Sequence, residues 1–398
     1  MQNNKKQVAE KLVIKDFKHF GGKHCITTSL KNLFDYHGLH LSEEMLFGLS
    51  GGAAFIYWYM KFMPVPFVGG RMGKGDDILV ETVRRIGGDA EFFQTASSKK
   101  GYQELKDQLK QGEPTLAFVD MPYLSYLSMP EDAHFGGHSI VVYGIDEEKN
   151  LVYISDRGKN GVTATIEELE KARNSKFQPF PPKNKLFKIK YPKKINQQKL
   201  EKGIKDSIKN SCNIMLRPPI TNFGLKGMQK WADLVLKWPK QFKGINLFLC
   251  LFNVFIFIEI GGTGGSSFRN MYAKFLEESA DILKKPQLKE VAKLFKKSAE
   301  VWSEIAIAAL PNYWPSLKKV RELMVKKNKI FEEQKPNALL EMKKISKILD
   351  QDLIPHKAVK EIQTRKKDIE KLFNDMRENI LECRDIEKQA FEMLDKVI

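Results

Sequence analysis

HFGGKHCITTSLKNLFDYHG, residues 19–38, carries the clearest structural signal in the N-terminal half. A pair of glycines predicts a turn, and Cys25 follows it at the expected start of a helix. Apolar residues at positions 26, 30, 33 and 34 have the spacing of a helix face that packs on a core, and Gly38 predicts the end of the helix. A thiol at a helix N-terminus has a lowered pKa, because unpaired N–H groups and the helix dipole stabilise the thiolate. A buried, unreactive cysteine is the alternative interpretation of Cys25.

A second stretch, residues 120–158, supplies a histidine and an aspartate. His138 opens a run of β-favouring residues (139–143), a polar turn follows, and a second run (151–155) ends at Asp156. Two such runs around a turn predict a β-hairpin, which brings His138 and Asp156 onto neighbouring strands. A carboxylate that orients an imidazole, which in turn takes a thiol proton, is the arrangement of nucleophilic cysteine enzymes. The order Cys, His, Asp on a helix and a sheet resembles papain-like enzymes.

The chain of 398 residues is long for a single core, so two domains are expected. Residues 1–193 predict an α+β fold with one antiparallel sheet, and residues 194–398 predict an all-α domain punctuated by prolines. Besides the hairpin, we expect strands at 55–63, 90–94, 115–120, 161–165 and 186–191, and helices at 25–37, 42–48, 77–86, 101–110 and 166–172. The second half is expected to form helices at 197–216, 227–238, 245–258, 267–283, 288–310, 316–333 and 338–349, and a long closing helix from 356.

The formal net charge of +17 is concentrated in the second half. Residues 1–193 hold 27 Lys and Arg against 23 Asp and Glu, a net +4, so residues 194–398 hold 39 against 26, a net +13. A solvated lysine-rich helical surface explains this charge, and a docking face for an acidic partner is the sharper interpretation. No RNA-binding or DNA-binding signature accompanies the lysines, which argues against nucleic acid.

Four scattered cysteines without a CxxC pair predict reduced thiols and a cytoplasmic protein. The segment MQNNKKQVAEKL has no apolar core of a signal peptide. The apolar run 245–258 is too short for a membrane span and indicates a buried helix. The 4-residue spacing of His134 and His138 flanks a Phe-Gly-Gly sequence that disfavours a helix, so no metal site is expected. No cofactor is expected either.

A glycine-rich loop at 261–265 runs into a predicted helix that carries Arg269. Such a loop can present N–H groups to a phosphate or carboxylate, and Gly262, Gly264, Gly265 and Arg269 are the residues that would bind it. No Gly-Lys-Ser/Thr follows, so this is not a P-loop. A tight helix connection that needs positive φ, with a surface-paired Arg269, is the alternative.

Several of these stretches resemble one known family. GKHCITTSLKNLFDYHGLHLSEEMLFGLS, HFGGHSIVVYGID and VYISDRG resemble the butirosin biosynthesis protein H-like N-terminal domain, a papain-like acyltransferase family, over roughly residues 15–160. NFGLKGMQKWADLVLKW and IEIGGTGGSSFRNMYAKFLEESA resemble the helical domain that often follows it. The resemblance implies an acyltransferase that moves an acyl group from a carrier-protein thioester to an amine.

Carried over by residue, the resemblance makes Cys25 the nucleophile, His138 the base and Asp156 the residue that orients the base. Papain-like enzymes usually place a glutamine six residues before the nucleophile as an oxyanion donor, and here that position is His19. An acidic acyl carrier protein is then the expected donor and a small amine the acceptor, and the sequence is compatible with a homodimer. A papain-like peptidase or amidase, and a non-catalytic binding protein on the same fold, are the alternatives.

Overall fold

The computed structural model describes residues 9–61, 63–71 and 75–398. Its chain contacts form two compact units. The first unit holds the described residues up to 41, together with residues 90–190 and 330–346, and the second holds residues 42–89, 191–329 and 347–398. Most of the N-terminal segment expected to lack a signal peptide lies outside the described residues.

This division differs from the single boundary after residue 193 that the sequence predicts. Residues 42–89 belong to the mostly helical unit, and residues 330–346 belong to the unit that carries the sheet. Both segments bury apolar side chains, among them Phe47 and Phe331. Composition along the chain therefore predicts where mixed structure changes to helical structure. It does not predict that residues 42–89 pack in the helical unit or that residues 330–346 pack in the sheet unit.

The first unit is built on a seven-stranded sheet in the order β4-β9-β5-β6-β7-β8, with β1 also paired to β6. The ladders between β5, β6, β7 and β8 are antiparallel. The strands are β1 (Lys11–Val13), β4 (Asp89–Phe93), β5 (Thr115–Val119), β6 (His138–Asp146), β7 (Leu151–Ser155), β8 (Val162–Ala164) and β9 (Leu186–Lys190). The antiparallel sheet confirms the α+β class predicted for the N-terminal half.

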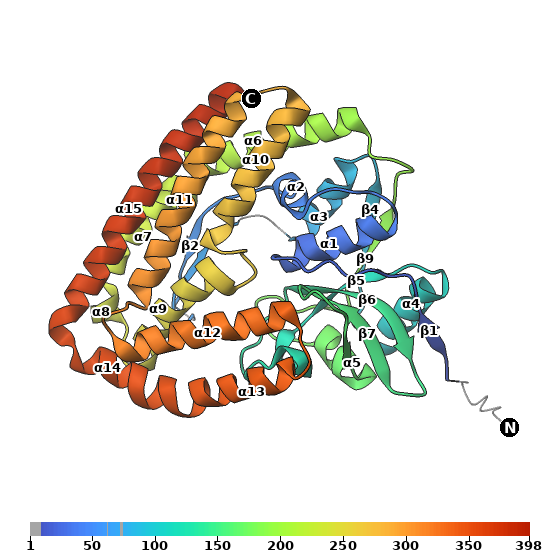
Figure 1. Ribbon diagram of the computed structural model, residues 1–398, viewed down its shortest axis with the longest axis horizontal. Helices are drawn as coiled ribbons and strands as arrows, with labels where there is room; N and C mark the ends of the chain where they lie inside the picture. The colour runs from blue at the N-terminus through green and yellow to red at the C-terminus, as the bar shows by residue number, and fades with distance from the viewer. Residues whose placement is uncertain (1–8, 62, 72–74) are drawn as a thin grey trace. The chain divides into compact units, whose positions relative to one another are not determined.

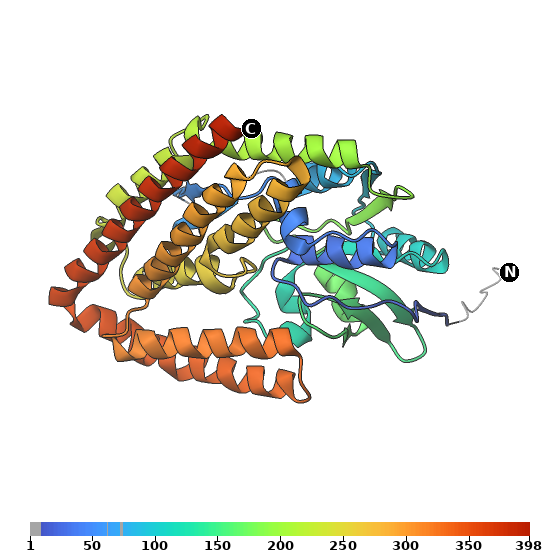
Figure 2. The ribbon, with the colours of Figure 1, turned by 45° about the horizontal axis from the view of Figure 1, so that its top comes forward.

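Helices pack on this sheet (Figures 1 and 2). Successive residues of β5 and β6 are buried, so side chains on both faces of the sheet are covered. The helix α1 (Cys25–Tyr36) packs on β5 and β6, whereas α4 (Ser98–Lys110) and α5 (Ile166–Asn174) contribute to a core with Val119 and Ile140. Side chains alternate between the faces of a strand. The start of α1 at Cys25 is as predicted, and in α5 Thr165 and Glu168 form a capping box.

The second unit is helical, with one small hairpin of β2 (Ile56–Trp58) and β3 (Phe67–Gly69). The predicted strand at 55–63 is thus much shorter. In Figure 1, α15 runs beside α7 and α11, which agrees with their packing contacts. The helices are α2 (Glu43–Leu49), α3 (Gly75–Arg84), α6 (Gln197–Leu216), α7 (Gly224–Val235), α8 (Trp238–Gln241), α9 (Ile245–Phe255), α10 (Arg269–Leu283), α11 (Gln287–Ala309), α12 (Pro315–Glu333), α13 (Ala338–Ile348), α14 (Val359–Thr364) and α15 (Lys366–Val397), of which α12 and α13 extend into the first unit.

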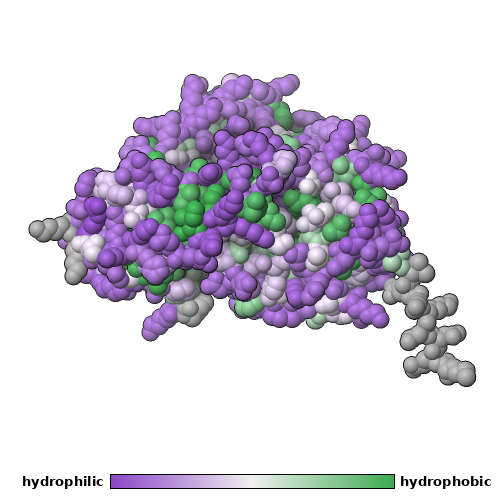
Figure 3. Space-filling model, turned by 60° about the horizontal axis from the view of Figure 1, so that its bottom comes forward, coloured by the Kyte–Doolittle hydropathy of each residue, from purple (hydrophilic) through white to green (hydrophobic). Residues whose placement is uncertain are grey.

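These bounds confirm the all-α class predicted for the C-terminal half. Two π-helical segments occur there. Ile256–Ile260 extends the helix predicted at 245–258, and Leu349–Ala358 connects the helices predicted at 338–349 and from 356. The core contains fully buried tryptophans, and Trp231 stacks on both Phe55 and Trp302, which also contact each other. Figure 3 shows a face on which hydrophilic residues predominate around separate hydrophobic patches. Within the described ranges, no helix is both long and apolar enough to span a membrane.

Candidate active site

Cys25 is the first residue of α1 and is partly exposed. The turn before it needs glycine, because a Cβ at Gly22 would lie 2.0 Å from Thr28 Oγ1. The Gly22 N–H donates to the carbonyl of Arg157 at 3.0 Å, which ties the turn to the chain segment after β7. The turn and the sheet therefore fix where the thiol lies.

His138 is the first residue of β6, and Asp156 directly follows the last residue of β7. Because Val141 pairs with Ser155 across the two strands, His138 and Asp156 lie at the same end of the sheet. His138 Nε2 is 2.8 Å from Asp156 Oδ2, and both side chains are buried. A backbone N–H from Arg157 donates to the other oxygen, Oδ1, at 2.7 Å.

The thiol of Cys25 is adjacent to this pair, and the contact with His138 affects its pKa. Burial raises the pKa of Cys25, but a hydrogen bond with His138, the charge of His138 and the Ser139 N–H outweigh burial and lower it to about 7. For His138, burial alone would lower the pKa. The charge of Asp156 outweighs burial, and the net pKa of His138 is raised. The pKa of Asp156 is lowered, because His138 and Arg157 outweigh its burial. A thiolate beside an imidazolium is the state these directions favour.

Comparison with known families relates two regions of the chain to known domains. Residues 24–157 match the family described as butirosin biosynthesis protein H, N-terminal, and residues 167–339 match a domain of unknown function, DUF4872. The chain has a butirosin protein H-like N-terminal domain followed by a DUF4872 domain. No curated protein matches it. The resemblance predicted from the sequence is confirmed, and the match relates the Cys25 region to an enzyme domain of a biosynthesis-related family.

His19, the predicted oxyanion donor of the butirosin protein H-like domain, has aromatic neighbours. Its ring contacts Phe17 and Tyr143, with ring centroids 5.5 and 5.0 Å away. Burial lowers the pKa of His19, which favours the neutral ring. Its Nδ1 is buried and has no hydrogen-bond partner among the described residues. The oxyanion role of His19 stays a prediction.

Arg269, predicted to face a ligand anion, is fully buried in the second unit. Its Nε and Nη2 donate to Glu387 at 2.7 and 2.9 Å. The remaining N–H groups reach the carbonyls of Ala54, Gly70 and Ser267. A guanidinium has five N–H donors, and protein oxygens accept all five. These contacts contradict the expected anion-binding role, because no donor of Arg269 is left for a ligand.

The glycines of the loop serve its turn. Gly262, Gly264 and Gly265 all have positive φ, between 68° and 82°, a conformation that side chains other than glycine disfavour. The N–H of Gly262 donates to Ile260 at 2.7 Å, and that of Gly265 donates to the Thr263 hydroxyl at 3.3 Å. These internal bonds agree with the tight connection that was the alternative interpretation, and any ligand role of the three glycines stays a prediction.

Two side chains near the candidate triad, Tyr126 and Arg157, were not predicted from the sequence. Tyr126 donates its hydroxyl to Asp156 Oδ2 at 3.0 Å. Arg157 holds its guanidinium 3.3 Å from the carbonyl of Lys23 and adds a positive charge that lowers the pKa of Cys25. Because Arg157 directly follows Asp156 in the sequence, its position near the candidate triad could have been predicted. Nothing in the sequence pattern marks Tyr126.

The segment 330–346 was expected in the helical domain and instead supports the chain after Asp156. Phe331 lies under the guanidinium of Arg157, 5.1 Å from ring centroid to Cζ. The N–H of Lys159 donates to the carbonyl of Glu332 at 3.1 Å, and that of Asn160 donates to Gln334 Oε1 at 2.8 Å. The DUF4872 match, which ends at residue 339, therefore includes residues that pack in the Cys25 unit.

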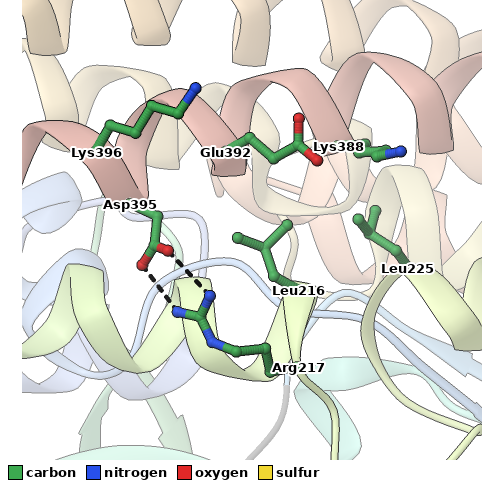
Figure 4. Close-up of a pocket in the computed structure, with 7 residues that line it drawn as sticks. All are labelled: Leu216, Arg217, Leu225, Lys388, Glu392, Asp395 and Lys396. Carbon is green, nitrogen blue, oxygen red and sulfur yellow. Dashed lines mark hydrogen bonds and ion pairs between the residues drawn. The ribbon is translucent and has the colours of Figure 1, made fainter.

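A hollow of about 340 Å³ lies in the second unit, and none of the predicted site residues lines it. Figure 4 shows Arg217 paired with Asp395 across it, with contacts of 2.9 and 3.0 Å. It is lined by Leu216, Arg217, Leu225, Lys388, Glu392, Asp395 and Lys396. Three bases and two acids line the hollow, so it has no strong charge of one sign that would indicate a ligand class. Over the described ranges, no group of three His, Cys, Asp or Glu side chains is placed to hold a metal ion.

Proposed function

We propose that the chain is a cysteine acyltransferase that moves an acyl group from a carrier-protein thioester to an amine through an acyl-enzyme on Cys25. The observation that supports this most is the hydrogen-bonded His138–Asp156 pair, with 2.8 Å between Nε2 and Oδ2, beside a thiol whose pKa is lowered to about 7. A thiolate at neutral pH is the nucleophile that such chemistry needs.

The first step exchanges one thioester for another. The Cys25 thiolate attacks the carbonyl carbon, the bond to the carrier sulfur breaks, and the leaving thiolate takes the proton held by His138. The new Cys25 thioester costs almost no chemical free energy, because a bond of the same type is lost. The negative oxygen formed during attack needs donors near the helix N-terminus, for which the Cys25 N–H and His19 are our candidates.

The second step forms the amide. The amine nitrogen attacks the Cys25 thioester, its proton passes to His138, and the carbon–sulfur bond breaks to return the thiolate and imidazolium. Thioester and amine become amide and thiol, so atoms and charge balance. Asp156 keeps the imidazole in the required tautomer throughout. An acidic carrier protein suits a chain whose residues 194–398 carry a net +13 (39 Lys and Arg minus 26 Asp and Glu), because complementary charge speeds encounter.

Intact-protein mass spectrometry tests this proposal. Incubation with a panel of acyl-carrier thioesters should add the acyl mass to the wild-type protein and not to Cys25→Ala, while Cys212→Ala, which changes a buried thiol, should be acylated normally. Loss of the nucleophile should slow transfer at least about a thousand-fold. Absence of an adduct on the wild-type protein would exclude the acyl-enzyme. An adduct that water removes as fast as any added amine would instead identify the peptidase or amidase alternative.

A further inference from the structure

Tyr126 forms a buried contact that the proposed chemistry leaves unused. It lies in a short 3-10 turn (Ser125–Leu127), and its ring packs in the core of the Cys25 unit. Its hydroxyl donates to Asp156 Oδ2 at 3.0 Å. His138 Nε2 contacts the same oxygen at 2.8 Å. A phenol and an imidazole therefore share one carboxylate oxygen.

The second oxygen of Asp156 is held separately, by the Arg157 N–H at 2.7 Å. A carboxylate oxygen has two lone-pair sites, so on Oδ2 the Tyr126 and His138 donors occupy both. Each donor withdraws negative charge from the oxygen that it binds. The Tyr126 hydrogen bond consequently reduces the negative potential that Asp156 presents to His138.

We propose that Tyr126 is a positioning residue that moderates the hold of Asp156 on the His138 imidazolium, and through His138 the stability of the Cys25 thiolate. The inference rests on the nucleophilic role of Cys25 proposed above. The hydroxyl keeps the carboxylate ionised and oriented, yet it prevents an over-stable imidazolium that would hold its proton when the leaving group or amine requires transfer.

Several charged and titratable groups surround the hydrogen-bonded residues Tyr126, Asp156, His138 and Cys25. His138 and Arg157 act on Cys25, and the same two residues act on Asp156. The pKa of Tyr126 is raised, first by burial and then by the Asp156 charge, with a smaller effect of Glu168. His24, next to Cys25, has its Nδ1 3.3 Å from Thr27 Oγ1. The variants below leave His24, Arg157 and Glu168 unchanged.

Two substitutions give opposite signs if the proposal holds. Tyr126→Phe keeps the ring and removes only the hydroxyl, so Asp156 attracts the His138 proton more strongly and the Cys25 thiolate forms at lower pH. Asp156→Asn removes the negative charge, so the imidazolium is weaker and the thiolate forms at higher pH. Each change is expected to move the midpoint by about half a unit or more, where one unit corresponds to about 1.4 kcal/mol.

The experiment is the rate of Cys25 alkylation by iodoacetamide as a function of pH, read by peptide mass spectrometry in the full-length protein. Tyr36→Phe is the matched control, because the Tyr36 hydroxyl donates a 3.0 Å bond to the Gly112 carbonyl in the same unit. We expect a downward shift for Tyr126→Phe, an upward shift for Asp156→Asn and no shift for Tyr36→Phe.

The inference is overturned if Tyr126→Phe leaves the midpoint unchanged, or moves it upward as Asp156→Asn does, since an upward shift means that the hydroxyl only keeps the pair in place. Both results leave the proposed acyl transfer intact. A wild-type midpoint at the ordinary cysteine value of about 8.5 would instead contradict the activated thiol itself, and with it the proposed function. Circular dichroism of each variant checks that the fold is retained.

Discussion

At the scale of single residues, the pKa of Cys25 shifts in the opposite direction to the pKa values of the other three cysteines, because His138 outweighs burial at Cys25 whereas burial dominates at the others. Cys25 is partly exposed beside His138, whereas Cys212, Cys250 and Cys383 are buried in helices and all four are free. Burial raises the pKa of Cys212 and of Cys250 to about 12, and it raises that of Cys383 as well. Helical, unbridged positions are what the sequence predicts for these three.

Iodoacetamide at pH 7.5 is therefore expected to label Cys25 selectively. The sign follows from the lowered pKa: the thiolate forms as pH rises through about 7, so labelling increases between pH 6 and 8. In His138→Ala the stabilising cation is gone, and the midpoint should rise toward or above the ordinary value of about 8.5. Peptide mass spectrometry of the labelled protein reads each site. Equal labelling of Cys25 and Cys212 in the native protein would contradict the prediction.

At the scale of elements, the end of α12 and the start of α13 belong to the core of the Cys25 unit. Phe331 and Met342 are buried in the cluster that includes residues of β5, β6 and β7. The opposite side of α13 is exposed at Leu340. A segment from the helical half of the sequence therefore completes the core beneath the sheet, and removing it would expose that core.

Phe331→Ala should lower the free energy of unfolding by about 3–5 kcal/mol, because a buried aromatic side chain is lost and a cavity remains. Leu340→Ala is the matched control: its side chain is 55% exposed, so a change within about 0.5 kcal/mol is expected. Urea unfolding followed by circular dichroism measures both. Similar losses for the two variants would mean that residues 330–346 do not support the core of this unit.

At the scale of the whole molecule, distant parts of the chain meet inside the second unit through Arg269. Its guanidinium binds Glu387 from α15 and carbonyls of residues 54 and 70. Ser298 and Trp302 of α11 also donate to Glu387, at 2.8 and 2.7 Å. Burial raises the pKa of Glu387, but the Arg269 charge and these donors outweigh burial and lower it. The Arg269 guanidinium thus joins α15 to residues 54 and 70, which composition assigns to the other half of the sequence.

Arg269→Met should destabilise the protein by about 3–5 kcal/mol, because Glu387 is left as a buried charge without its cation. The double variant Arg269→Met with Glu387→Met should recover much of the loss. Since the folded-state pKa of Glu387 is lowered, the contribution is present above the ordinary value of 4.5 and is lost as pH falls below it. Chemical unfolding at pH 7 and pH 4 tests both statements. A loss under about 1 kcal/mol at pH 7 would show that the pair is not needed for stability.

Features that depend on neighbours along the chain could be predicted from the sequence. The turn before Cys25, the start of α1 and the β6–β7 hairpin follow from glycine placement and from apolar periods of 3.6 and 2 residues. The hairpin also brings His138 and Asp156 together, since its register is local. The family resemblance rests on these same stretches, and the matched region begins one residue before Cys25.

Features that join remote segments could not be predicted from the sequence and depend on the three-dimensional packing. No local pattern tells that Arg269 is enclosed by Glu387, that Tyr126 reaches Asp156, or that residues 330–346 pack in the Cys25 unit. An amphipathic pattern predicts that one face of a helix is buried, but it does not predict which element packs against that face. An arginine or a tyrosine occurs at surfaces, in ligand sites and, where its polar groups find partners, in cores. Long-range packing makes that choice, because it alone sets which donors and acceptors lose water together.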